Sequence, residues 1–174
     1  MSLSFTVGGA RGTFEARFAT EVAGVLDNTF GAEGDWEGVA PRHFGEVAGS
    51  GWLDLQRRAE RELGREAVPN LLAPGDDGRA VYLPAMVNAI DLPLSIGQPL
   101  RCASLPGLRI ELAALAACWE LPLDDDGLKS LLHVYRDPSD GWVADEPEVF
   151  SFARLALAAN EAVRRDCPLW LVGG

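Results

Sequence analysis

Cys102, His133 and Asn160 follow one another in the thiol, imidazole and amide order that some cysteine hydrolases use. A cysteine nucleophile needs a helix N-terminus or a neighbouring cation to lower the pKa of its thiol. Cys102 precedes an expected helix and adjoins Arg101, but no family signature surrounds it. Such an order alone does not transfer between families. A small hydrolase or transferase that uses Cys102 and His133 is therefore an alternative, ranked below a buried thiol and an exposed histidine without catalytic roles.

An acidic stretch around one tryptophan indicates recognition rather than catalysis. Trp142 is flanked by Asp137, Asp140, Asp145 and Glu146. In a protein interface an aromatic side chain anchors the contact, while carboxylates steer a basic partner toward it. The competing interpretation is a loop that its tryptophan pins to the core. The predicted binding site consists of Trp142 and the four acidic residues that flank it.

Motifs for phosphate and metal ions are incomplete in this chain. The glycine-rich stretch 8–12 lacks the spacing of a dinucleotide fingerprint and the Lys-Ser/Thr of a P-loop. If Gly127 takes position 6 of a calcium-binding loop, Pro122 and His133 fall where carboxylates are required. His43 and His133 have no companion at the spacing of zinc ligands. We therefore expect no metal and no cofactor.

The charge of the chain restricts the classes of partner. With 26 acidic and 15 basic residues, the net charge is −11. Nine of the acidic residues lie in the segment Glu120–Glu148, which holds only two basic residues, Lys129 and Arg136. Nucleic acid and anionic membrane surfaces attract basic proteins, so both are excluded as expected partners. A basic protein partner is the favoured class.

Length and composition predict one globular domain, 1–174, in the cytoplasm. The 174 residues are 48% hydrophobic, which is enough for a core. Three widely spaced cysteines favour a reducing compartment over a disulfide framework. The chain begins without the basic and apolar regions of a signal peptide. One lysine beside 14 arginines, with abundant alanine and glycine, is typical of a GC-rich bacterial gene.

The segment 105–119 is the predicted centre of the fold. Leu108, Leu112, Leu115 and Trp119 recur at helical spacing, and alanines fill the other side. A helix that is apolar nearly all round is covered on several sides. At this length it is too short to span a bilayer, which needs about 20 apolar residues.

The other expected elements place the candidate residues around this helix. The aspartates 124–126 are interpreted as the cap of the helix that carries His133. Residues 31–49 are expected to be irregular because they contain five glycines and a proline. We expect helices at 13–28, 51–63, 127–135 and 147–166, strands at 3–7, 92–96, 100–103 and 168–172, and a hairpin of 71–73 with 80–83.

These expectations combine into one hypothesis. The fold is α+β, with four to five helices around the central apolar helix 105–119 and a small, mostly antiparallel β-sheet. The function is that of a non-enzymatic acidic binding protein that engages a basic protein partner. A bacterial immunity protein or a similar inhibitor of a cationic toxin has these properties.

Overall fold

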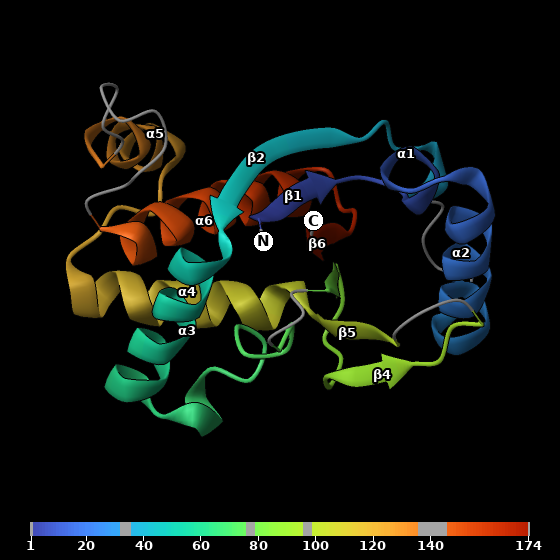
Figure 1. Ribbon diagram of the computed structural model, residues 1–174, viewed down its shortest axis with the longest axis horizontal. Coiled ribbons are helices and arrows are strands. Elements are labelled where there is room, and N and C mark those ends of the chain that lie inside the picture. The colour runs from blue at the N-terminus through green and yellow to red at the C-terminus, as the bar shows by residue number, and fades with distance from the viewer. Residues whose placement is uncertain (1, 32–35, 76–78, 96–98, 136–145, 174) are drawn as a thin grey trace.

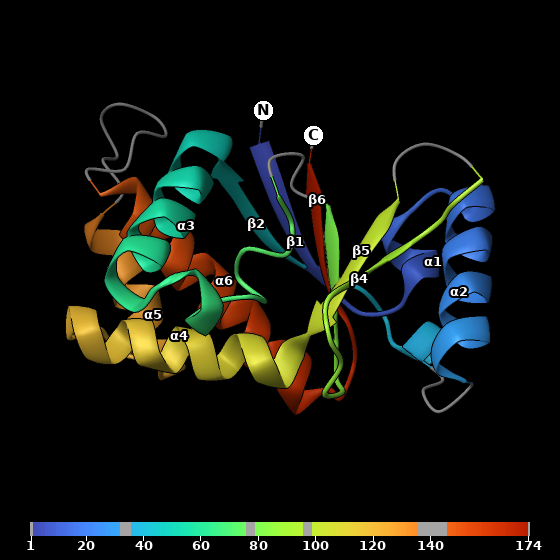
Figure 2. The ribbon, with the colours of Figure 1, turned by 90° about the horizontal axis from the view of Figure 1, so that it is seen from below.

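A six-stranded sheet lies between two groups of helices in the computed structural model (Figure 1, Figure 2). The structure describes residues 2–31, 36–75, 79–95, 99–135 and 146–173. The strands are β1 (Ser2–Val7), β2 (Arg42–Ala48), β3 (Ala80–Leu83), β4 (Ile90–Leu92), β5 (Leu100–Ser104) and β6 (Leu169–Gly173). The helices are α1 (Ala10–Thr13), α2 (Ala16–Phe30), α3 (Gly49–Leu63), α4 (Leu105–Trp119), α5 (Asp125–Val134) and α6 (Pro147–Arg164), with the 3-10 turns η1 (Trp36–Gly38) and η2 (Arg65–Ala67). The predicted α+β class is confirmed.

The sheet is larger than expected, and it is mixed. Its strand order is β2-β1-β6-β3-β5-β4, with β3 and β5 parallel and the other neighbours antiparallel. The predicted hairpin is wrong, because β3 pairs with β5 and β6 while residues 71–73 lie in turns. A parallel pair needs a long crossover connection, and no local pattern identifies the distant strand that a segment will meet.

The segment 31–49 contains a regular strand, contrary to our expectation. Strand β2 forms the edge of the sheet and pairs antiparallel with β1. The pairing passes through a bulge, because Ser4 lies opposite Glu46 while Thr6 lies opposite His43. Gly45 stands in this bulge with φ of +89°, a conformation that side-chain-bearing residues rarely adopt. The glycine that argued against a strand is therefore part of how the strand bends.

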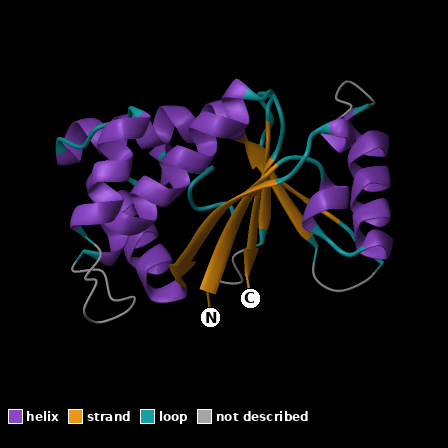
Figure 3. Cartoon of the chain, turned by 90° about the horizontal axis from the view of Figure 1, so that it is seen from above, coloured by secondary structure: helices purple, strands orange, loops and turns teal. Residues whose placement is uncertain are grey.

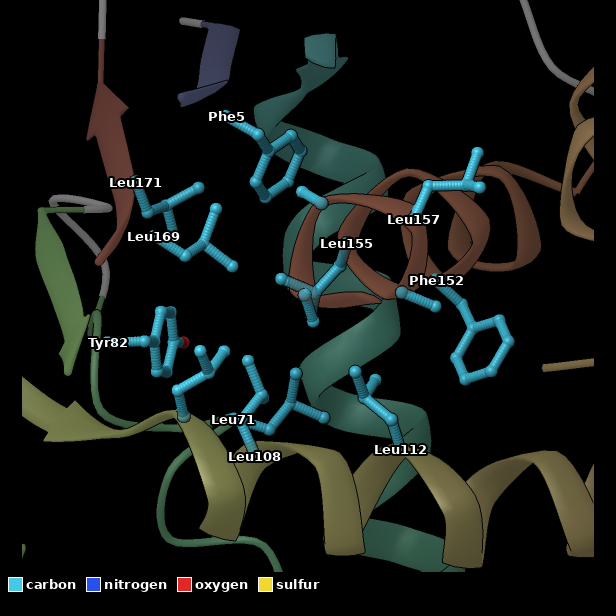
Figure 4. Packing of buried hydrophobic residues seen from close by; sticks show 14 of the residues in the cluster. Phe5, Leu71, Tyr82, Leu108, Leu112, Phe152, Leu155, Leu157, Leu169 and Leu171 are labelled. Atoms are coloured by element: carbon cyan, nitrogen blue, oxygen red, sulfur yellow. The ribbon is translucent and has the colours of Figure 1, made fainter. Parts of the chain in front are cut away.

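Helix α6, rather than α4, is the central helix. It packs on β1, β2 and β6 and also contacts α3, α4 and α5, and Leu155 points from it into the space bordered by Leu169 and Leu108 (Figure 4). Eleven of its residues are buried. Helix α4 instead exposes one face, which carries Arg109, Ile110 and several alanines. Alanine is tolerated in both environments, so an alanine-rich helix gives little information about which face is buried.

Among the described helices, α1 and α2 cover the opposite face of the sheet (Figure 2, Figure 3). Strand β6 supplies side chains to both faces, since Leu169 and Leu171 join the core under α6 while Trp170 joins the core under α2. Strand residues alternate between faces, so burial of successive residues places the strand inside the fold. No helix in the described ranges is long and apolar enough to cross a membrane.

Candidate functional site

The structure does not bring the thiol and the imidazole together. Cys102 is fully buried in β5, in the core on the α2 side of the sheet. Its burial, together with the nearby Asp91 carboxylate, raises the pKa of the Cys102 thiol to about 12. His133 is exposed on α5, which packs against α6 on the other side of the sheet (Figure 2). A thiol-dependent activity through this pair therefore finds no support in the geometry.

One residue of the predicted acidic binding site can be placed. Glu146 is exposed and stands at the N-cap of α6. Asp137, Asp140, Trp142 and Asp145 lie outside the described residues. The neighbouring Glu148 accepts a hydrogen bond from Arg58 of α3 at 3.0 Å, so it is engaged within the fold.

Helix α5 and its N-cap carry three acids of this segment, Asp124, Asp125 and Asp126, and the helix is attached to α6 by polar contacts. Asp124 caps α5, since its Oδ1 accepts from Gly127 N at 2.9 Å. Asn160 of α6 donates to Asp125 Oδ1 at 3.0 Å and to the Leu123 carbonyl at 2.9 Å. Arg164 donates to Asp125 Oδ2 at 2.7 Å. These contacts hold the first turn of α5 in a defined place beside α6.

Electrostatics stabilises the same attachment. The hydrogen bond from Asn160, with the Arg164 guanidinium, holds the pKa of Asp125 below its ordinary value. Hydrogen bonds from Arg164 and from Arg42 of β2 lower the pKa of Glu161 in the same way. Arg164 thus lies between two ionised carboxylates, and its charge is neutralised within the fold.

An open groove runs along this attachment. Two adjoining hollows of about 190 and 420 Å³ share Arg109, Leu123 and Asn160 in their walls. Alanines 113, 156 and 159 line the groove between α4 and α6, and their small side chains leave this space unfilled. These two hollows together form the α4–α6 groove.

Apolar side chains are exposed at the groove. Ile110 is 67% exposed, Val163 40% and Leu123 36%, and each lines one or both hollows. Leu123 and Asp124 both line the groove, and the exposed acids Glu120 and Asp126 lie within three residues of Leu123. Arg109 is exposed at the same groove and has no ion-pair partner in the described part of the chain. The arrangement is an apolar centre beside an acidic segment, which suits recognition of a protein surface.

Sequence reasoning missed the groove, although one signal for it was present. The inward stripe of α4 is Leu108, Leu112 and Leu115, and Ile110 falls off that stripe. An isoleucine outside the inward stripe of an otherwise alanine-rich helix indicates an apolar surface. The contribution of α6 could not be read in this way, because Ala156 and Ala159 belong to a continuous apolar run.

No metal site accompanies the groove. Among the described residues no three His, Cys, Asp or Glu side chains gather closely enough to hold an ion. No protein-family model matches the sequence, and searches of curated proteins and of solved structures return no match. The candidate site is therefore defined by its own geometry.

Proposed function

We propose that this chain is a non-enzymatic binding protein that engages a basic protein partner at the surface formed by α5 and the α4–α6 groove. An apolar side chain of the partner enters the α4–α6 groove, and the acidic segment Glu120–Glu148 attracts the partner's cations. An immunity protein or another inhibitor of a cationic protein would use this combination.

The single observation that carries the proposal is the exposure of Ile110, Leu123 and Val163 around one groove. Monomeric proteins seldom gather exposed apolar side chains without a use for them. A groove of this kind provides the apolar contact that slows dissociation. The surrounding carboxylates provide long-range attraction, which accelerates association at low ionic strength.

The charge near the groove also constrains the partner. Arg164 is neutralised by Asp125 and Glu161, whereas Arg109 is exposed and without such a pair in the described ranges. A fitting partner is basic overall and presents one hydrogen-bond acceptor or carboxylate to Arg109.

The experiment is capture by the immobilised chain from the organism that produces it, at low salt, with elution at high salt. Association and dissociation of the eluted protein are then measured with two variants. The charge variant is Asp137→Asn, Asp140→Asn, Asp145→Asn and Glu146→Gln, and the groove variant is Ile110→Ser and Leu123→Ser. We expect the charge variant to slow association about tenfold at low salt, and the groove variant to accelerate dissociation about tenfold.

A matched control separates the acidic segment from total charge. Asp27→Asn, Glu46→Gln, Glu66→Gln and Asp166→Asn remove the same number of acidic charges, at exposed positions elsewhere in the chain. This control should leave dissociation unchanged and slow association less than the charge variant does. If no basic protein is captured, or if the control and the charge variant behave alike, the proposal is wrong.

A further inference from the structure

A separate apolar cavity of about 400 Å³ lies between α2 and the sheet. Phe14 and Phe18 form its helical side, and Leu100, Leu171 and Val172 form its sheet side. The cavity opens to solvent on one side, since Glu15, Arg79 and Pro99 in its wall are exposed. An apolar hollow of this size is within the range of small-molecule sites.

The aromatic wall of the cavity is braced from behind. The Phe14 ring makes edge-on contacts with Phe18 at 5.0 Å and with Trp170 at 5.2 Å between centroids. Trp170 is buried, and its Nε1 donates to the Gly8 carbonyl at 2.7 Å. These contacts oppose a collapse of the two phenylalanines into the hollow.

Two opposite charges line the same cavity. They belong to Arg79, which precedes β3, and to Glu15, which precedes α2. Within the described ranges neither side chain has a hydrogen-bond or ion-pair partner. A ligand carboxylate would be attracted by Arg79 and repelled by Glu15, and a ligand ammonium would meet the reverse. An uncharged amide can accept a hydrogen bond from the guanidinium and donate one to the carboxylate.

We propose that this cavity binds a small apolar ligand whose polar end is an uncharged group that both donates and accepts hydrogen bonds, such as a primary amide. The apolar body of the ligand lies against Phe14, Phe18 and Val172, and its polar end lies at Arg79 and Glu15. This site is independent of the α4–α6 groove, because the two share no residue and lie on opposite faces of the sheet.

Titration calorimetry with three probes of equal tail length tests the proposal: octanamide, octanoate and octylamine. We expect octanamide to bind about tenfold more tightly than either ion, because each ion is repelled by one of the two charged groups of the site. Glu15→Gln should raise the affinity for octanoate, and Arg79→Gln should raise the affinity for octylamine. Leu94→Trp, which fills the cavity from its rim, should weaken all three.

Arg57→Gln removes an exposed arginine of α3, remote from the cavity, and serves as the matched control. It should leave the three affinities in their original order. Absence of octanamide binding to the unaltered protein would overturn the proposal. Equal binding of the three probes, or tightest binding of an ion, would equally exclude the uncharged ligand class. Unfolding curves of each variant establish that a lost affinity is not a lost fold.

Discussion

The two faces of the sheet are covered in different ways. On one face α3, α4 and α6 build a continuous core, and a buried polar cluster joins α4 to the sheet through the turn at 69–75. On the other face α1 and α2 form a thin layer over a smaller core and leave the apolar cavity open. The contrast shows that one sheet supports a closely packed layer and a loosely packed layer at the same time.

Asn70 is the hub of the buried polar cluster. Its backbone N–H and side-chain amide donate to Glu111 Oε1 at 2.9 and 2.6 Å, and its Oδ1 accepts from Ser104 N at 2.9 Å. Leu71 N donates to Glu111 Oε2 at 2.7 Å, and the Tyr82 hydroxyl donates to the Asn70 carbonyl at 3.1 Å. The turn at 69–75 is thereby attached to α4, β5 and β3. No comparable cluster of buried hydrogen bonds is found under α2 in the described residues.

The largest expected effect is that of Glu111→Ala. Glu111 is 4% exposed, and its loss leaves two backbone N–H groups without acceptors. We expect a loss of about 3 kcal/mol in the free energy of unfolding, measured by urea denaturation. Glu111→Gln keeps one acceptor oxygen and should cost less. A loss for Glu111→Ala no larger than that of an exposed acid such as Glu66→Ala would show that the cluster does not hold the tight layer together.

The cost of Glu111→Ala should also depend on pH. Burial raises the pKa of Glu111, although hydrogen bonds from Asn70 and Leu71 oppose the shift. A carboxyl whose pKa is raised by folding binds its proton more tightly in the folded state. The stability it contributes is therefore greatest below 4.5, the ordinary value, and is lost as the pH rises through the folded-state pKa. Urea curves at several pH values should show a larger cost at acid pH than at neutral pH.

Gly107→Ala tests the packing of the same layer. A Cβ at Gly107 would lie 2.5 Å from Asn70 Nδ2 and 3.1 Å from Asn70 Cγ. Because the Asn70 amide is held by Glu111 and Ser104, it has little freedom to move away. We expect a loss of about 2 kcal/mol by urea denaturation, although alanine is the better helix former. A neutral or stabilising effect would show that the layer is looser than we infer.

The sequence predicted those elements whose ends carry local signals. The Asp124 cap begins α5 and Pro147 begins α6, both as expected, and β5 and β6 lie within one residue of their predicted bounds. Strand β2 was missed because Gly45, in its bulge, was interpreted as a sign of irregular structure. The ranking of α4 over α6 failed because alanine is abundant in both helices and is tolerated at buried and exposed positions alike.

The candidate site was predictable to a smaller extent. The acidic segment is visible in the sequence, and the interface hypothesis drawn from it stays a prediction. The α4–α6 groove depends on Leu123 and Val163, which are far apart in the sequence and meet only when Asn160 attaches α5 to α6. The apolar cavity under α2 is likewise lined by segments that are distant in the sequence, and the strand order of the sheet brings them together. Local sequence patterns carry no information about contacts between segments that are distant in the sequence.

The rates at which a reagent labels the buried cysteines compare how easily the two helical layers open. Cys102 is buried under α2, Cys167 is buried in the core under α6, and Cys118 is exposed. In a Cys118→Ser background, a thiol reagent reaches either remaining thiol only after local or global opening. We expect Cys102 to be labelled about tenfold faster than Cys167, because opening of one thin layer requires about 1.4 kcal/mol less than unfolding of the tight layer. Mass spectrometry of the labelled peptides measures both rates, and equal rates would mean that the layers open together.

The smallest expected effect is that of Gly24→Ala in α2, which has the opposite sign to Gly107→Ala. Gly24 lies inside the helix, and a Cβ built there meets no atom within 4 Å. Alanine restricts the unfolded chain and favours the helix, so we expect a gain of about 0.5–1 kcal/mol in the free energy of unfolding. The same methyl group thus stabilises the protein at Gly24 and destabilises it at Gly107, because only the position in α2 has room for it. If both glycine variants changed stability in the same direction, the difference in packing between the two faces would not govern their stability.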